Sequence, residues 1–380
     1  MMMLQIGLLL SILVVMATAK VTFITKEFLN PQLNESFRHM TKDESTGFIY
    51  VAGVNKILKL TEKLTVNQSV RTGPEDDDPD CLPYDIQMCV KKKKLHSYSK
   101  ALLIDQKDKR LIACSSLFQG SCKKYWLSDI TKFDEDSSRF EYVVANNRTA
   151  STVAFIAPGP SLKGELVPPN VMYVGTTYSN TGLKIIRDDI PAFCSRNLNT
   201  LKVTYKGLSD GTTIFLETTH RTSFYVNYIY GFSSDKFSYM ATVQRESTQS
   251  EKYITKLIRV CQDDKKFYSY TEVELVCEYN GAKYNILQAA HKAKPGKYLA
   301  EALRISTTDD VLFATFSIGK VNSKEPLNDT AVCFYPLKAI KKSFTNNIVK
   351  CFEGSGTVGP DHIVNTKDCQ KARVSYYFLK

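Results

Sequence analysis

The stretch Phe48-Ile-Tyr-Val-Ala-Gly53, followed closely by Lys56-Ile-Leu-Lys-Leu60, sets a pattern that recurs along the chain. Both runs are short and rich in β-branched and aromatic residues, and a short turn separates them, which is typical of a β-hairpin. A second hairpin is expected where residues 101–104 and 111–114 flank the polar residues 105–109. These pairs predict a protein built from antiparallel strands.

Hydrophobic runs that end in a small residue recur at intervals of about 60 to 75 residues, the length of a four-stranded propeller blade with generous loops. They start near Phe48, Leu111, Met172, Phe237 and Leu312. Small residues suit the crowded inner strands near a propeller axis, so we interpret these runs as inner strands. A large sandwich with long loops would show similar spacing. Further strands are expected at residues 171–175, 213–216, 224–230, 237–243 and 311–316.

Helices are expected at only two places, both as insertions between strands. Residues 285–291 (Asn-Ile-Leu-Gln-Ala-Ala-His) form one of them. Residues 336–349 form the other, because four apolar side chains fall at helical spacing there: Leu337, Ile340, Phe344 and Ile348. No linker rich in Pro, Gly or Ser divides the chain, so a single domain is expected over residues 20–380.

The N-terminal residues predict secretion. Residues 4–16 form an apolar run that is too short to span a bilayer, and Ala17-Thr18-Ala19 supplies a small-x-small cleavage signal. Residues 1–19 are therefore predicted to be a signal peptide. The lack of Lys or Arg before the run leaves an uncleaved membrane anchor as the alternative. We expect a secreted or extracellular protein, placed at the cell surface if the chain belongs to a longer receptor.

Ten cysteines in a chain of 380 residues predict structural disulfides once the chain enters an oxidising compartment. No Cys-x-x-Cys occurs and no cysteine has a nearby histidine, so the usual zinc spacings are absent. Acceptor sequons for N-glycosylation begin at Asn34, Asn67, Asn147 and Asn328. We expect at least two of them to carry glycans.

The net charge of +11 points to acidic partners. A secreted chain does not meet nucleic acid, which leaves acidic proteins, anionic glycans or membrane surfaces. The one dense basic cluster is Lys91, Lys92, Lys93 and Lys94, close to the acidic residues 75–80. Two solvated segments that partly neutralise each other are one interpretation, and a glycosaminoglycan contact at the lysines is the other.

No enzyme, cofactor or metal is expected. The five histidines are dispersed, and no nucleophile elbow, phosphate loop or dinucleotide fingerprint occurs. The acidic pairs at 188–189, 263–264 and 309–310 invite calcium or acid-base interpretations, but adjacent residues on a strand point to opposite faces. A secreted hydrolase on a propeller scaffold is the alternative, although we find no converging set of acidic or histidine residues for it.

Residues 257–277 (LIRVCQDDKKFYSYTEVELVC) resemble the central part of plexin sema domains, where a cysteine, a Phe-Tyr-Ser-Tyr block and a second cysteine occur in this order. The resemblance covers most of residues 40–355. Its other landmarks are Thr72-Gly-Pro74, the pair Cys81 and Cys89, Leu111-Ile-Ala-Cys-Ser-Ser-Leu-Phe-Gln-Gly-Ser-Cys122, Tyr284-Asn-Ile-Leu-Gln-Ala-Ala290, Asp309-Asp-Val-Leu-Phe-Ala314 and Val332-Cys-Phe-Tyr-Pro336.

The resemblance implies an all-β, sema-type seven-bladed β-propeller with about five blades present, acting as a receptor module in cell or axon guidance. It implies semaphorins as protein ligands, with homotypic plexin contacts as a further expectation. The disulfides that it implies are Cys81 with Cys89, Cys114 with Cys122, Cys277 with Cys333, and Cys351 with Cys369. Cys194 has no obvious partner, and Cys261 is expected to pair in a segment that this chain lacks.

By analogy with the family, the partner surface is expected in loops within residues 187–206, with Arg187, Arg196, Asn199 and Lys202 as contact residues. Arg is favoured at such interfaces. Residues 361–380 match the family poorly, so a truncated receptor or a soluble decoy for the ligand is also considered. The hepatocyte growth factor receptor group shares the sema domain. Plexin is favoured over it because the segment from Cys81 to Cys89 has cysteines only at its ends.

Overall fold

The computed structural model describes residues 36–83, 86–134, 141–161, 167–206, 211–353 and 360–364. The predicted signal peptide and the acceptor Asn34 lie outside these residues. They belong to a separate unit, Met1–Asn34, whereas the sheets belong to the unit Glu35–Lys380. No helix among the described residues is long and apolar enough to cross a membrane.

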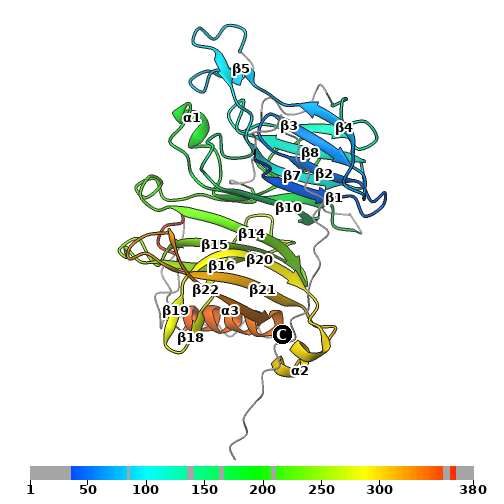
Figure 1. Cartoon of the computed structure of the whole chain (residues 1–380). Coiled ribbons are helices and arrows are strands. Elements are labelled where there is room, and N and C mark those ends of the chain that lie inside the picture. The colour runs from blue at the N-terminus through cyan, green and yellow to red at the C-terminus, as the bar shows by residue number, and fades with distance from the viewer. Residues whose placement is uncertain are drawn as a thin grey trace, which may run out of the picture. The chain divides into compact units, whose positions relative to one another are not determined.

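Three four-stranded and two three-stranded antiparallel sheets follow one another along the chain (Figure 1). The first sheet contains β1 (His39–Lys42), β2 (Ile49–Ala52), β3 (Lys56–Leu60) and β4 (Val66–Arg71). The second contains β7 (Ser99–Asp105), β8 (Arg110–Ser115) and β9 (Cys122–Trp126). The third contains β10 (Thr152–Pro158), β11 (Asn170–Thr176), β12 (Phe193–Asn197) and β13 (Thr213–Ile214).

The fourth sheet contains β14 (Val226–Ser234), β15 (Phe237–Arg245), β16 (Tyr253–Cys261) and β17 (Thr271–Glu274). The fifth contains β20 (Ile286–Ala293), β21 (Val311–Gly319) and β22 (Pro326–Pro336). Two hairpins accompany the sheets, β5 (Glu75–Asp77) with β6 (Lys93–Leu95) and β18 (Cys277–Tyr279) with β19 (Ala282–Tyr284). The helices are α1 (Lys184–Arg187), α2 (Lys297–Leu303) and α3 (Leu337–Phe352).

The sheets pack in series through their first strands. β1 contacts β7, β7 contacts β10, β10 contacts β14, and β14 contacts β20. Four apolar clusters fill the spaces between successive sheets, for example Tyr50 with Leu111 and Tyr239 with Leu312. This serial stacking of antiparallel meanders is how propeller blades succeed one another.

Each of the first four sheets is also linked to the next one by a hydrogen bond from a side chain to a main-chain carbonyl. The donor or the acceptor lies either in the sheet or in a loop that flanks it. Two of the donors are lysines that are almost completely buried, and their ammonium groups need such acceptors because a buried charge without a partner is costly. The bonds are Lys59 Nζ to Leu127 O (2.7 Å), Lys100 Nζ to Ala150 O (2.7 Å), Thr177 Oγ1 to Val226 O (2.5 Å) and Thr255 Oγ1 to Asn285 O (2.9 Å).

Both hairpins expected from the sequence are confirmed, as β2 with β3 and β7 with β8. The recurrent runs that end in small residues are confirmed as strands, but they are not the first strands, through which the sheets pack in series. They are β2, β8, β11, β15 and β21, the second strand of each sheet. One of these small residues lies where the next sheet approaches closely. A Cβ added at Gly175 of β11 would lie 2.3 Å from the Tyr228 ring of β14.

The helix expected at residues 285–291 was wrong, because this segment forms strand β20. Leu287 pairs with Phe316 and Ala289 pairs with Thr315, so Gln288 is an extra residue in a bulge. A bulge interrupts the alternation of apolar and polar residues that identifies a strand. The helix expected at residues 336–349 is confirmed as α3, and Leu337, Ile340 and Phe344 are its buried residues.

Three disulfides link described cysteines: Cys81 to Cys89, Cys114 to Cys122 and Cys277 to Cys333. These are three of the pairs that the plexin resemblance implies. Cys351 is also disulfide-bonded, and Cys369, its expected partner, lies outside the described residues. Cys194, which is buried, and Cys261 are the two described cysteines without a disulfide.

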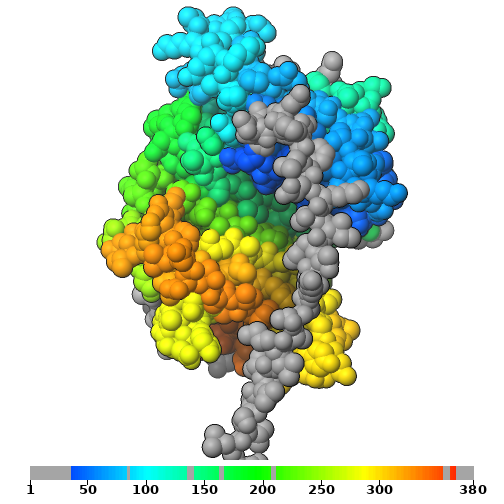
Figure 2. Space-filling view, in the orientation of Figure 1, coloured from blue at the N-terminus to red at the C-terminus, as the bar shows by residue number. Residues whose placement is uncertain are grey.

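The β5–β6 hairpin, coloured light blue to cyan, stands off from the sheets in the space-filling view (Figure 2).

The packing of α3 predicts a large effect for one aromatic residue. Phe344 is fully buried in the cluster between the fourth and fifth sheets. We expect Phe344→Ala to lower the free energy of unfolding by about 3 to 5 kcal/mol, because it leaves a cavity. The matched control Phe352→Ala removes a ring that is 62% exposed and should change it by less than about 0.5 kcal/mol. Denaturant unfolding measures both, and equal effects would contradict the packing described.

Candidate protein-binding surface

A groove of about 390 Å³ lies beside the end of the third sheet. Its floor comes from β12, and one wall comes from the turn that follows this strand. The other lining residues come from the segment that begins at residue 141 and from the residues after α1. The lining residues are Glu141, Tyr142, Asp189, Arg196, Lys202, Val203, Tyr205 and Lys206.

Local sequence explains the turn after β12. The side-chain oxygen of Asn197 accepts hydrogen bonds from the main-chain N–H groups of Asn199 (2.8 Å) and Thr200 (3.0 Å), an arrangement that Asn favours in turns. The Asn197 N–H then donates to the carbonyl of Lys202 at 2.9 Å. The chain therefore reverses within a few residues, and Lys202 lies exposed on the groove wall.

Arg196 organises the groove from below. Its side chain is only 3% exposed, and its guanidinium donates to the carbonyls of Leu201 (2.9 Å) and Tyr142 (2.7 Å). An ion pair to Glu141, 3.8 Å between nitrogen and oxygen, adds a partly buried carboxylate. Because Nη1 and Nη2 both donate to carbonyls of the chain itself, Arg196 joins two segments that line the groove rather than presenting a free charge.

The upper part of the groove carries mixed charges and aromatic rings. Lys206 Nζ lies 3.0 Å from Asp189 Oδ2, and both side chains are more than half exposed, so water screens this pair. The Tyr205 hydroxyl donates to the carbonyl of Pro160 at 3.2 Å, and the Lys265 ammonium lies 5.2 Å from the centre of its ring. Aromatic rings beside exposed charges are typical of surfaces that bind folded proteins.

The residues expected from the sequence divide into two groups. Arg196 and Lys202 line the groove, whereas Arg187 and Asn199 do not. Arg187 ends α1, and its guanidinium donates to the carbonyl of Asn180. Asn199 is exposed and its carbonyl accepts a hydrogen bond from Lys124.

Sequence reasoning missed several lining residues. Tyr205 and Lys206 lie within the expected range of residues 187–206, and an aromatic residue beside a lysine could have indicated a partner contact there. Glu141 and Tyr142 reach the groove from a segment far away in the sequence, and no local pattern indicates that approach.

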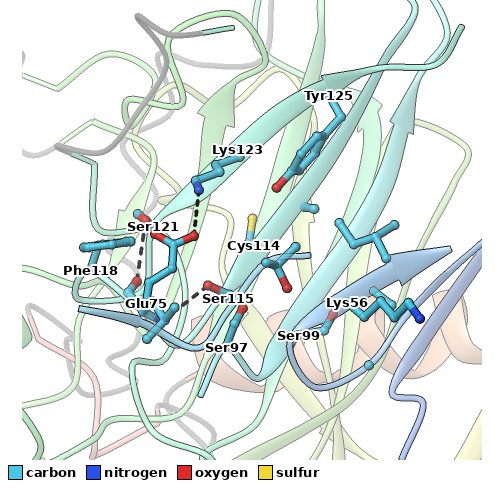
Figure 3. Close-up of a pocket in the computed structure, with 16 residues that line it drawn as sticks. Lys56, Glu75, Ser97, Ser99, Cys114, Ser115, Phe118, Ser121, Lys123 and Tyr125 are labelled. Atoms are coloured by element: carbon cyan, nitrogen blue, oxygen red, sulfur yellow. Dashed lines mark hydrogen bonds and ion pairs between the residues drawn. The ribbon is translucent and has the colours of Figure 1, made fainter. Parts of the chain in front are cut away.

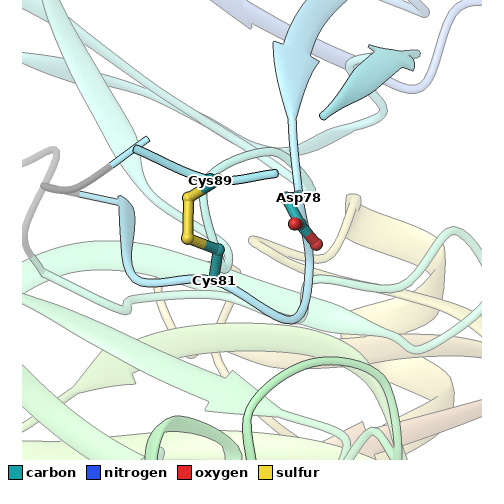
Figure 4. A group of neighbouring side chains, drawn as sticks. All are labelled: Asp78, Cys81 and Cys89. Carbon is teal, nitrogen blue, oxygen red and sulfur yellow. A yellow bond between two sulfur atoms is a disulfide. The ribbon is translucent and has the colours of Figure 1, made fainter. Parts of the chain in front are cut away.

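Two other places are unsuited to ligands. The cavity in Figure 3, between the first two sheets, has a volume of about 30 Å³, which suits one or two water molecules. Lys123 and Glu75 form an ion pair at its edge, 3.2 Å apart. Asp78, Cys81 and Cys89 gather in Figure 4, but the two sulfurs are joined in a disulfide and are therefore not thiolate ligands for a metal.

The lysine cluster belongs to the β5–β6 hairpin. Residues 91–94 are all exposed. Lys93 and Lys94 pair in the ladder with Asp77 and Asp76, and Lys94 Nζ lies 3.0 Å from Asp76 Oδ2. The hairpin thus holds one ion pair at its surface, and the Lys92 ammonium donates to the carbonyl of Gln87 at 3.0 Å, while all four lysines stay exposed. Features of both interpretations of this cluster are therefore present.

A buried polar network links the fourth sheet to His362. The Glu272 carboxylate, 5% exposed, meets Lys256 Nζ at 3.0 Å, Gln244 Nε2 at 2.9 Å, the Tyr270 hydroxyl at 2.6 Å and His362 Nε2 at 3.2 Å. Burial alone would raise the pKa of Glu272, but the charges of Lys256 and His362 and the hydrogen bonds outweigh it and hold this pKa well below its usual range. His362 is thereby held against the fourth sheet, while main-chain contacts of residues 362–364 with the segment just after β13 hold them to the third.

Comparison with known proteins agrees with this architecture. Residues 287–368 match the Sema domain family. Plexin-A2 of Homo sapiens is 33% identical over 362 residues, which cover 89% of this chain and 18% of that plexin. Plexin-A4 of Mus musculus is 33% identical over 349 residues, which cover 85% of this chain and 18% of the relative. The chain thus spans less than a fifth of the length of these plexins.

Solved structures show the same likeness. The extracellular region of plexin A4, domains 1 to 8, superimposes with a TM-score of 0.75 at 30% identity, covering 89% of this chain and 38% of that one. Drosophila Semaphorin 2a superimposes with a TM-score of 0.57 at 12% identity, covering 82% of this chain and 49% of that one, which shows the fold alone.

The fold and these matches define the class as an all-β protein that carries a Sema-domain sequence. Within that class, the chain is related to the plexins through their extracellular sema region. This relationship, rather than any missing motif, supports the expectation that the chain is not an enzyme. It also favours plexin over the hepatocyte growth factor receptor group.

The Glu272 network predicts a pH-dependent stability. Glu272→Gln leaves the buried ammonium of Lys256 without its counter-charge and should lower the free energy of unfolding at pH 7 by about 3 kcal/mol. Because the folded pKa of Glu272 lies below the usual 4.5, the stabilisation is fully present above about pH 4.5 and is lost as the pH falls through the folded value. Unfolding curves at several pH values should show the deficit shrinking in acid. The exposed neighbour Glu274, changed to Gln, is the control; a pH-independent deficit would contradict the account.

Proposed function

We propose that this chain is an extracellular protein-binding module of the plexin kind, that its ligand is a semaphorin, and that it serves in cell or axon guidance. The likeness to the extracellular region of plexin A4 carries this proposal. The polar groove at the end of the third sheet supplies a surface suited to a folded partner. Homotypic contacts between plexins remain a further part of the proposal.

The finer architecture belongs to the same proposal. Residues 20–380 are a sema domain, and the five sheets of three or four strands are five blades of a seven-bladed propeller. Supporting this, the sheets contact one another in series through their first strands. A rigid stack of this kind holds binding loops in fixed positions, which lowers the entropy lost when a partner binds.

The groove is favoured as the contact surface because it combines exposed charges with partly buried rings. Lys202 and Lys206 are exposed, whereas Tyr205 is half-buried and anchored through its hydroxyl. Rings that are already fixed lose little side-chain entropy on binding, and flanking charges steer the partner. Arg196 keeps the groove open in this proposal by joining two of its walls.

A second proposal concerns the lysines at residues 91–94, because they stand together, exposed, on a projecting hairpin. They form a glycosaminoglycan contact alongside the protein-binding surface. Among the residues that the structure describes, only Lys94 of these four lysines forms an ion pair with an acidic side chain.

Charge reversal in the groove tests the first proposal. In the full chain, Lys202→Glu with Lys206→Glu should weaken semaphorin binding about tenfold, because rim charges guide and orient the partner. Surface plasmon resonance against a panel of semaphorin ectodomains measures the dissociation constant. The control, Lys252→Glu with Lys283→Glu, makes the same change in charge at two other positions and should leave binding unchanged. If both double variants lose affinity to the same extent, a contact in the groove is contradicted. If the wild-type chain binds no semaphorin of the panel, the proposed class of ligand is overturned.

Heparin chromatography tests the second proposal. Replacing residues 91–94 together by Ser should lower the salt concentration needed for elution, since each ammonium group contributes a screened attraction to sulfates. A matched variant removes four exposed lysines elsewhere: Lys107, Lys283, Lys297 and Lys338. Elution that shifts equally in both variants reflects net charge alone and would reject a contact at this hairpin.

A further inference from the structure

Asn67 occupies an unusual place in the first sheet. It lies in β4, the outermost strand, and among the described strands only β3 pairs with β4. Gln68 pairs with Lys59 and Val66 pairs with Leu60, so Asn67 is an extra residue in a bulge. Its side chain is exposed. A sequon acceptor therefore sits at an irregular point of a free strand edge.

Asn328 repeats this placement at the other end of the series. It lies in β22, the outermost strand of the fifth sheet, next to a shift of register where Thr330 pairs with Ser317 and Pro326 pairs with Gly319. The second half of β22 is supported by the disulfide from Cys333 to the β18–β19 hairpin. The first half, which carries Asn328, has only β21 as a strand partner among the described residues.

Both strands have the properties of an aggregation-prone edge. Val66 is 47% exposed on β4, while Leu327 and Val332 are 43% and 57% exposed on β22. Asp329 is the only charged residue in β22. An exposed strand edge with apolar side chains and little charge is a template for pairing with the same strand of another molecule.

We propose that N-linked glycans on Asn67 and Asn328 shield the open edges of β4 and β22 and keep the chain from associating with itself through them. A glycan at a bulge projects from the strand, and its volume excludes a second strand from the edge. Natural proteins protect edges by bulges and charged residues for the same reason. The proposal requires secretion but does not depend on which ligand is bound, so it can fail independently of the semaphorin proposal.

The third described sequon provides the contrast. Asn147 lies in the loop before β10, and its side-chain oxygen accepts hydrogen bonds from the main-chain N–H and the hydroxyl of Thr149. It is half-buried and belongs to no strand. A glycan on Asn147 therefore covers no strand edge, and its removal should leave the association state unchanged.

The first experiment uses the full chain secreted from mammalian cells. Peptide mass spectrometry should find Asn67 and Asn328 glycosylated, and light scattering after size-exclusion chromatography should find a monomer. Native enzymatic removal of the glycans from the folded protein should produce dimers or larger species at concentrations about tenfold below those at which the untreated chain associates. Unmodified Asn67 and Asn328, or a deglycosylated chain that stays as monomeric as the untreated one, would overturn the proposal.

Variants then locate the effect. Ser69→Ala with Thr330→Ala destroys both edge sequons while keeping the asparagines, and it should associate as the deglycosylated chain does. Thr149→Ala, which removes the Asn147 sequon, should stay monomeric. Adding Val66→Lys and Val332→Lys to the double sequon variant should restore the monomer, because an edge lysine opposes strand pairing. Association of Thr149→Ala to the same extent, or no rescue by the lysines, would count against edge shielding. If the sequon variants are not secreted, native deglycosylation of the wild-type chain still decides the question.

Discussion

The structure depends on one constraint, which is that the second strand of each sheet is paired on both edges and packs at least one face against a neighbouring sheet. β15 shows it most clearly, since all of its residues except the two at its ends are buried. Its neighbours β14 and β16 supply the hydrogen bonds, while the third and fifth sheets cover its faces. Such a strand leaves no room for a large residue where the next sheet approaches closely, as at Gly175 in β11. Near these strands, lysine and threonine side chains donate hydrogen bonds to carbonyls of the next sheet or of its flanking loop.

This constraint explains which parts of the fold could be predicted from the sequence. A strand that is mostly buried carries a nearly continuous apolar run, so Phe237–Arg245 and Val311–Gly319 were recognisable. β20 was not, because the bulge at Gln288 gives its apolar residues a spacing that imitates a helix. The order of the strands within each sheet was not predicted, since periodicity reveals burial but does not show which neighbour causes it.

The candidate binding surface was less predictable because contacts between distant segments build it. Lys202 could be proposed from residue type and position alone. The role of Arg196 depends on the carbonyl of Tyr142 and on Glu141, which approach from more than fifty residues away in the chain. An arginine in a predicted loop suggests a partner contact, whereas burial of 97% of its side chain makes it a support for the surface. Burial of this kind depends on packing between segments, which one sequence does not reveal.

Serial packing supports the middle of each sheet far better than its outer strands, and the covalent features of the chain follow that difference. The disulfide Cys277–Cys333 ties a hairpin to the outer strand of the fifth sheet, and Cys81–Cys89 closes a loop beside the projecting β5–β6 hairpin. In both places the crosslink limits the unfolded ensemble. The two strand sequons also lie on outer strands. Among the described second strands none carries a sequon, and only β8 carries a disulfide, through Cys114. Its crosslink to Cys122 joins β8 to β9, the outer strand of its own sheet, so this bond too secures an outer strand to the packed interior.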